Sequence, residues 1–121
     1  MSHTILAVDD SPSMRRMVVH VLKTGGYDVL EAGDGEEALA IARSQRVDAV
    51  LTDHNMPKMD GIVLVQRLRA LEAYARTPIM LLTTESSAEM KQKGREAGAS
   101  GWMVKPFDPD RLLEMFGKLF A

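Results

Sequence analysis

The sequence contains no cysteine, which excludes disulfide bonds, thiolate metal sites and cysteine nucleophiles. It also lacks an excess of charge of one sign, because 15 basic and 17 acidic residues give a formal net charge of -2. Such a chain has no general positive field to attract nucleic acid or an anionic membrane. No apolar run is long enough to cross a membrane, and we expect no secretory leader. We therefore expect a cytoplasmic protein that binds neither nucleic acid nor membranes.

The chain has 121 residues, of which 45% are hydrophobic and 26% charged. This length suits one domain, and the composition is typical of globular proteins rather than disordered ones. No linker, low-complexity tract or internal repeat interrupts the sequence. We expect residues 1–121 to form a single domain, without an output domain, that remains a monomer.

Short apolar segments alternate with longer segments of helical period. The short segments are residues 4–8, 27–32, 49–52, 78–83 and 101–104. Most carry valine, isoleucine or threonine, and each is too short for a core helix, so we predict strands. The first, third and fourth are apolar on consecutive residues, which indicates central strands of a parallel sheet with helices on both faces. The second mixes charged and apolar residues and is predicted as an edge strand.

The longer segments carry start and stop signals of helices. Starts are predicted at Ser11-Pro12, Asp34, Gly61, Ser86 and Asp108-Pro109, and stops at Gly25-Gly26 and Gly98. Met17 and Val18 begin the predicted apolar stripe of the first helix, and the third helix is predicted to run from Gly61 to Tyr74. The alternation predicts an α/β fold of type (βα)5.

Four of the predicted strands end in polar residues. Asp9 and Asp10 follow the first strand, Asp53 the third, Thr83 and Thr84 the fourth, and Lys105 the fifth. Each residue alone has an ordinary interpretation as a helix cap, a turn or a solvated charge. The carboxyl ends of parallel strands meet at one edge of the sheet, where ligands bind in open α/β folds. Together, therefore, these residues predict a functional site.

The chemistry of this set favours a metal ion and a phosphoryl group. Neighbouring carboxylates repel each other unless a cation lies among them, and Mg²⁺ prefers hard oxygen ligands. A metal ion beside a lysine suits an incoming phosphoryl group. Asp53 lies between the acid pair and Lys105 in the predicted order, and a carboxylate nucleophile gives an acyl phosphate.

Competing motifs are absent from the sequence. It has neither glycine-rich nucleotide loop nor a G-x-S-x-G nucleophile elbow. His3, His20 and His54 lack the spacing of metal ligands. His54 adjoins Asp53 but is expected to point to the other side of the chain.

Three segments resemble the receiver domain of two-component response regulators, most closely its single-domain chemotaxis members. They are Val8–Arg16, Asp53–Gly61 and Ala97–Phe107. The resemblance covers nearly the whole chain and implies a doubly wound, flavodoxin-like fold. The strand order 2-1-3-4-5 is taken from the family, for which it is known, because the periodicity gives no order.

The resemblance also implies roles for the residues at the predicted sheet edge. Asp53 corresponds to the phosphoacceptor, which receives a phosphoryl group from a histidine kinase. Asp10 and Asp53 correspond to direct Mg²⁺ ligands, and Asp9 to a ligand acting mostly through water. Asn55 corresponds to the position that supplies a backbone carbonyl to the metal, and Lys105 to the lysine that pairs with the phosphate.

Further positions correspond to the switch and to its timing. Thr83 matches the hydroxyl that reorients onto the phosphoryl oxygen. Trp102 takes the aromatic switch position, where the family usually has tyrosine or phenylalanine. Asn55 and Glu85 match the pair that tunes dephosphorylation, and the peptide before Pro106 matches one that is cis in the family.

The resemblance implies a signalling protein that catalyses only its own phosphorylation and dephosphorylation. Its expected partners are a histidine kinase and the flagellar motor switch protein. Two other functions stay open: a phosphorelay intermediate or phosphate sink, and a small Mg²⁺-dependent phosphatase acting on an external substrate. The chain could also be part of a longer regulator.

Overall fold

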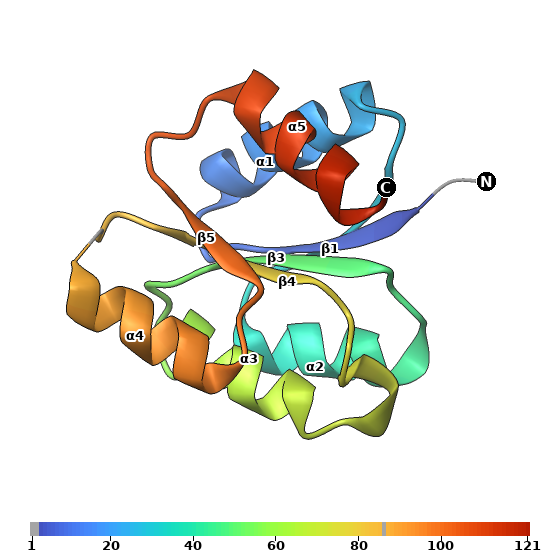
Figure 1. The fold of residues 1–121 in the computed structure, drawn as a ribbon. Helices are drawn as coiled ribbons and strands as arrows, with labels where there is room; N and C mark the ends of the chain where they lie inside the picture. Colours follow the sequence, from blue (N-terminus) through green and yellow to red (C-terminus); the bar gives the residue numbers. More distant parts are fainter. Residues whose placement is uncertain (1–2, 86) are drawn as a thin grey trace.

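The computed structural model describes residues 3–85 and 87–121, which form a five-stranded sheet between two layers of helices (Figure 1). The strands are β1 (Thr4–Val8), β2 (Asp28–Ala32), β3 (Ala49–Asp53), β4 (Ile79–Thr83) and β5 (Gly101–Val104). All neighbouring strands are parallel, in the order β2-β1-β3-β4-β5. The predicted fold class and strand order are confirmed, and the three most apolar strands are central.

The helices divide between the two faces of the sheet. They are α1 (Pro12–Thr24), α2 (Gly35–Ser44), α3 (Gly61–Arg69), the 3₁₀ turn η1 (Glu72–Tyr74), α4 (Ala88–Ala97) and α5 (Pro109–Leu119). Figure 1 shows α1 and α5 on one face, with α2, α3 and α4 on the other. No helix in the described part of the chain has both the length and the apolar character needed to span a membrane.

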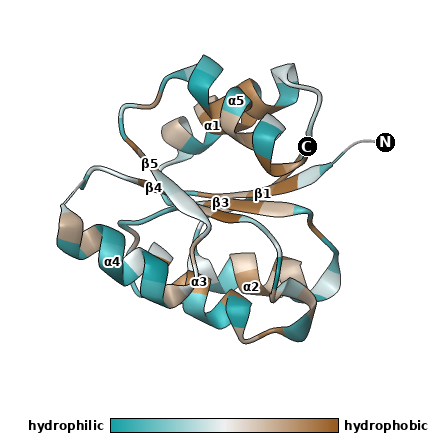
Figure 2. Ribbon diagram, viewed as in Figure 1, coloured by the Kyte–Doolittle hydropathy of each residue, from teal (hydrophilic) through white to brown (hydrophobic). Residues whose placement is uncertain are grey.

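Two hydrophobic cores result from the alternation of side chains along the strands. Leu6 and Val8 of β1 join the core beneath α2 and α3, whereas Ile5 and Ala7 join the core beneath α1 and α5. Figure 2 shows the central strands β1 and β3 in brown, the colour of hydrophobic residues, between the two layers of helices. Met17 was predicted in the buried stripe of α1, but its residue is 53% exposed. It precedes Val18 by one residue, which rotates it about 100° away from the buried face.

Most of the predicted helix starts carry side-chain caps. The Ser11 hydroxyl accepts a hydrogen bond from the Met14 amide, and the Asp34 carboxylate accepts one from the Glu37 amide. The cap of α4 is Ser87, whereas the prediction was Ser86, which lies outside the described residues. The helix therefore begins one residue later than its sequence pattern suggested.

The third helix is shorter than predicted. It ends at Arg69, and the residues near Tyr74 form the separate turn η1. The Arg69 guanidinium donates hydrogen bonds to the carbonyl oxygens of Tyr74, Thr77 and Gly98 at 2.7–2.9 Å. These bonds hold the chain in a turn where the apolar periodicity alone would continue the helix.

Candidate functional site

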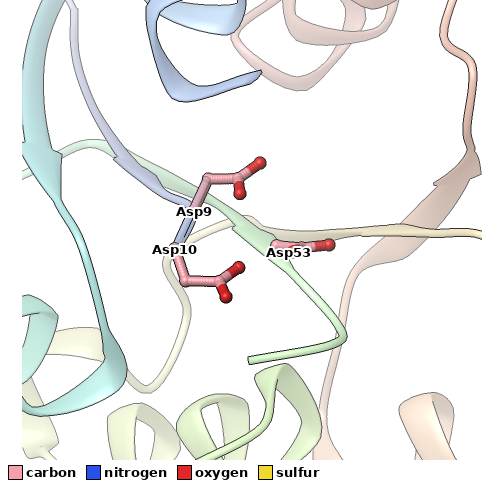
Figure 3. A group of neighbouring side chains, drawn as sticks. All are labelled: Asp9, Asp10 and Asp53. Atoms are coloured by element: carbon pink, nitrogen blue, oxygen red, sulfur yellow. The ribbon is translucent and has the colours of Figure 1, made fainter. Parts of the chain in front are cut away.

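The predicted acidic residues meet at the carboxyl edge of the sheet. Asp9 and Asp10 follow β1, and Asp53 ends β3, the neighbouring strand. Figure 3 shows the three side chains as neighbours at the ends of β1 and β3, all pointing to the same side of the view. Each offers a carboxylate oxygen, and these oxygens lie within 4.8 Å of one another. Carboxylates this close repel each other unless a cation is among them.

Lys105 supplies one positive charge to this cluster. Its Nζ lies 2.6 Å from Oδ1 of Asp53, and the two side chains are 16% and 5% exposed. The backbone N–H of Lys105 donates to the Thr83 carbonyl at 2.7 Å, which fixes the start of the loop after β5. The Lys105–Pro106 peptide is cis, as the resemblance implied. A single ammonium group thus faces three carboxylates.

Asp9 is the most deeply buried acid of the three. Its Oδ1 accepts a hydrogen bond from the Ser11 amide at 2.9 Å. Its Oδ2, among the described residues, has no hydrogen-bond partner. Burial raises the pKa of Asp9, and the charges of Asp53 and Asp10 raise it further, against the lowering effects of the Ser11 amide and of Lys105. An ionised carboxylate here calls for more positive charge than Lys105 provides.

These residues fit a small divalent cation. The donors are hard carboxylate oxygens, which suit Mg²⁺, and that ion keeps several waters rather than requiring a complete protein cage. Asp10 is exposed, so solvent reaches the cluster. Such a cation explains why Oδ2 of buried Asp9 has no hydrogen-bond partner in the part of the chain that the structure describes.

The sequence-predicted residues Asn55 and Glu85 flank the cluster from the loops after β3 and β4. Both residues are exposed. The Asn55 side-chain amide donates to the Thr84 hydroxyl at 3.5 Å, so Thr84 also belongs to the rim of the site. Thr84 was predicted at this edge because it directly follows the fourth strand, and its contact with Asn55 places it on the rim of the cluster.

Two further contacts were not predicted from the sequence. The Arg15 guanidinium donates to the carbonyl oxygen of Asp9 at 2.7 Å and pairs with Glu31 at 3.3 Å. Gly61, the first residue of α3, lies so close to the chain that an added Cβ would stand 2.3 Å from the Asp53 carbonyl oxygen. Neither contact has a recognisable sequence motif, because both depend on how helices pack beside the strand ends.

Thr83 and His54 lie next to each other at the same edge. Thr83 is fully buried, and its Oγ1 lies 3.2 Å from Nδ1 of His54. The same oxygen accepts a hydrogen bond from the Glu85 amide at 3.0 Å. No sequence pattern indicated the contact between His54 and Thr83, because it depends on the register of β3 against β4.

Trp102, on the edge strand β5, is partly buried and packs against the core under α2 and α3. Two cations from α4 lie over its ring, with Lys91 Nζ at 5.6 Å and the Arg95 guanidinium carbon at 6.0 Å from the centroid. Such contacts hold a cation against the electron-rich ring face. Trp102 therefore joins β5 to the exposed side of α4.

This geometry can be compared with that of known proteins. Residues 5–117 match the family described as the response regulator receiver domain. The chain belongs to this family. Receiver domains are signalling modules. In this chain the carboxylates and Lys105 lie at the carboxyl edge of the sheet of that domain.

Individual relatives of the receiver domain include chemotaxis proteins. The chain is 39% identical over 117 residues to chemotaxis protein CheY-3 of Vibrio cholerae, covering 96% of this chain and 90% of that one. It is 43% identical over 101 residues to a gliding motility regulatory protein of Myxococcus xanthus. That match covers 84% of this chain but spans only 13% of the length of the Myxococcus protein.

Solved structures agree with this relationship. Chemotaxis response regulator CheY4 of Vibrio cholerae superposes with a TM-score of 0.94 at 48% identity, covering 98% of this chain and 99% of that one. The receiver domain of a sensor histidine kinase from Pseudomonas aeruginosa superposes with a TM-score of 0.89 at 30% identity, covering 98% of this chain and 97% of that one. In that domain a magnesium ion is coordinated in the active site cleft.

Proposed function

We propose that this receiver domain accepts a phosphoryl group on Asp53 from a histidine kinase, in a reaction that requires Mg²⁺. The observation that carries the proposal is the 2.6 Å contact of Lys105 with Asp53 beside the buried Asp9 Oδ2, which has no hydrogen-bond partner among residues 3–85 and 87–121. A carboxylate nucleophile, a lysine and a group of oxygen ligands suited to a cation are the parts that phosphoryl transfer needs.

The metal would be held by Asp9, Asp10 and Asp53, together with the backbone carbonyl of Asn55. When bound, Mg²⁺ supplies positive charge that offsets the negative charge of the phosphoryl oxygens. Asp9 would act mostly through water. Among the family's solved structures, a magnesium ion in the Pseudomonas receiver domain supports this assignment.

In the transfer step, a carboxylate oxygen of Asp53 forms a bond to phosphorus as the phosphorus–nitrogen bond of the kinase phosphohistidine breaks. The bonding electrons leave with the imidazole, which takes up a proton. Lys105 already contacts one oxygen of Asp53 and would pair with the phosphoryl group. The domain contributes positioning and electrostatic stabilisation. Water as nucleophile reverses the modification, and Asn55 and Glu85 would tune its rate from the rim.

Phosphorylation would then shift the domain between two conformations of one fold. Thr83 would move its hydroxyl onto the phosphoryl oxygen, and Trp102 would respond on the neighbouring strand. The domain therefore acts as a signalling protein, and its chemistry is confined to its own modification.

The output we propose is control of the flagellar motor in chemotaxis, in the cytoplasm. The similarity to CheY-3 and CheY4 supports it. The partner would be the motor switch protein, which would bind the surface that includes Trp102 and the cations Lys91 and Arg95 of α4.

The test is phosphorylation by acetyl phosphate and by a phosphorylated histidine kinase, with and without Mg²⁺. Wild type should be labelled only with Mg²⁺, and Asp53→Asn should not be labelled. Asp28→Asn, an exposed position on β2, is the matched control and should be labelled normally. Labelling of Asp53→Asn would refute the assignment.

A pull-down then separates the possible outputs. Motor switch protein retained only by the phosphorylated form supports control of the motor. Rapid return of the phosphoryl group to a kinase histidine instead identifies a phosphorelay intermediate or phosphate sink. Steady turnover of a phosphomonoester identifies a phosphatase.

A further inference from the structure

We propose that His54 is a positioning residue that holds the Thr83 hydroxyl away from Asp53 until the domain is phosphorylated. The inference rests on the proposed function, because it concerns the movement of Thr83 toward the phosphoryl group. In this proposal, the hydrogen bond to His54 determines how readily Thr83 moves toward the phosphoryl group.

The register of two central strands places these side chains together. Asp53 of β3 pairs with Leu82 of β4, so His54 stands opposite Thr83. The His54 amide donates to the Leu82 carbonyl at 2.9 Å, which continues the ladder by one residue. Since side chains alternate along a strand, His54 and Thr83 share one face while Asp53 takes the other. The strand therefore places Thr83 on the face opposite Asp53, and the contact with His54 directs the Thr83 hydroxyl away from that carboxylate.

The available donors and acceptors indicate which atom donates in the hydrogen bond between Thr83 and His54. Thr83 is fully buried, so its O–H needs a protein acceptor. The amide of Glu85 donates to Oγ1 and cannot accept. Among the described residues, Nδ1 of His54, at 3.2 Å, is the acceptor in reach. The proposed bond therefore runs from the Thr83 hydroxyl to Nδ1 of His54, an arrangement that places the ring proton on Nε2.

A hydroxyl carries one hydrogen and cannot donate to two acceptors at once. Thr83 must release His54 before it can donate to a phosphoryl oxygen on Asp53. The bond to His54 therefore stabilises the unphosphorylated conformation selectively. A typical net hydrogen-bond energy corresponds to about a 2- to 10-fold change in the conformational equilibrium.

The surroundings of His54 allow the bond to be exchanged. The half-buried ring lines an open groove of about 340 Å³ between α3 and α4, beside Glu85 and Met90. Water in this groove can take the place of the Thr83 hydroxyl at Nδ1 when the threonine leaves. Exchange of a protein partner for water keeps the energy difference modest, as a reversible switch requires.

The experiment compares His54→Leu, His54→Asn and wild type. Apparent affinity for beryllium fluoride, which mimics a phosphoryl group on a carboxylate, is measured at saturating Mg²⁺ by Trp102 fluorescence. His54→Leu should raise this affinity about 2- to 10-fold, because a larger fraction of the domain is competent. His54→Asn should restore the wild-type value, since its Oδ1 stands near the position of Nδ1 and accepts a hydrogen bond. Mg²⁺ affinity should be equal in all three proteins.

Two controls isolate the bond itself. His20→Leu removes an exposed imidazole from α1 and should change nothing. In a Thr83→Val background, His54→Leu should have no effect on beryllium fluoride affinity, because the hydroxyl is already absent. Nitrogen chemical shifts of His54 should show the proton on Nε2 in wild type and should change in Thr83→Val.

The outcomes separate the inference from the proposed function. Unchanged or weaker beryllium fluoride binding by His54→Leu, or His54→Asn behaving like His54→Leu, overturns the role of His54 even if wild type is phosphorylated normally. Nitrogen shifts that do not respond to Thr83→Val overturn it as well, without reference to phosphorylation. A wild type that neither accepts phosphate nor binds beryllium fluoride refutes the proposed function, and the role of His54 with it.

Discussion

Lys105 Nζ and Asp53 Oδ1 lie 2.6 Å apart, and they join the end of β3 to the loop after β5. The pair is largely shielded from water, with side chains 16% and 5% exposed. A hydrogen bond between two charged groups is strong. Removing the Lys105 ammonium would leave the buried charge of Asp53 without an opposite charge beside it. In the metal-free domain, the Lys105 ammonium offsets part of the repulsion among the carboxylates of Asp9, Asp10 and Asp53.

Lys105→Met should lower the free energy of unfolding of the metal-free domain by about 1–3 kcal/mol, because Asp53 then stays buried without its cation. Urea unfolding in EDTA measures the loss. The matched control is Lys118→Met, whose partner Glu114 lies at 3.3 Å on the exposed side of α5. Its effect should be below about 1 kcal/mol. Equal effects of the two substitutions would contradict a special role for the buried pair.

Mg²⁺ should stabilise the wild-type domain by binding the folded state. At a free concentration one hundred times the dissociation constant, the free energy of unfolding should rise by about 2.7 kcal/mol. Thermal unfolding with increasing Mg²⁺ measures this, and EDTA should reverse it. Asp9→Asn and Asp53→Asn should each reduce the effect. A melting temperature that does not respond to Mg²⁺ in wild type would count against the metal site.

The stability of the metal-free domain should depend on pH through Asp9. Its pKa in the folded state is raised above the ordinary value of 3.8, chiefly by burial. Between those two values the folded state binds more protons than the unfolded state, so the contribution of Asp9 to stability falls as pH rises. Above the raised pKa, the contribution of Asp9 to the free energy of unfolding stays at its lower value.

Asp9→Asn should remove this decline and make the metal-free domain more stable than wild type at neutral pH. Urea unfolding of both proteins in EDTA across the acidic range measures the difference. Asp28→Asn on the edge strand serves as the control and should leave the curve unchanged. A wild-type curve that rises through the same pH interval where the variant is flat would refute the argument.

Gly61→Ala should destabilise the domain by about 1–3 kcal/mol, because the new Cβ would stand 2.3 Å from the Asp53 carbonyl oxygen and 2.9 Å from the His54 Cα. Both are backbone atoms, which cannot move aside without displacing the end of β3. Gly117→Ala is the matched control, since an added Cβ in α5 meets nothing within 4 Å. It should stabilise the helix by about 0.5–1 kcal/mol. Thermal unfolding compares the two, and a harmless Gly61→Ala would disprove the close approach.

The sequence was sufficient to predict the elements and the acidic cluster. Asp9 and Lys105 each follow a strand and Asp53 is the last residue of one, and parallel strands bring such residues to one edge. The order of the strands came only through the family resemblance. The end of α3 could not be predicted, because the hydrogen bonds of Arg69 to Tyr74, Thr77 and Gly98 exist only in the folded chain.

The contact of His54 with Thr83 illustrates a second limit. Alternation along one strand gives the direction of a side chain but not its neighbour. The neighbour depends on the register of β3 against β4, which pairs Asp53 with Leu82. The contact of Arg15 with the Asp9 carbonyl has the same character, since it depends on how α1 packs beside the strand end.

The alternation of side chains at the end of β3 has a consequence for how this domain can diversify. Asp53 and His54 are consecutive in the chain but face opposite sides of the sheet, with Thr83 beside His54. In the proposed function, substitutions of residues that line the groove beside His54 would therefore change how readily Thr83 leaves His54 while the carboxylates around Asp53 stay the same.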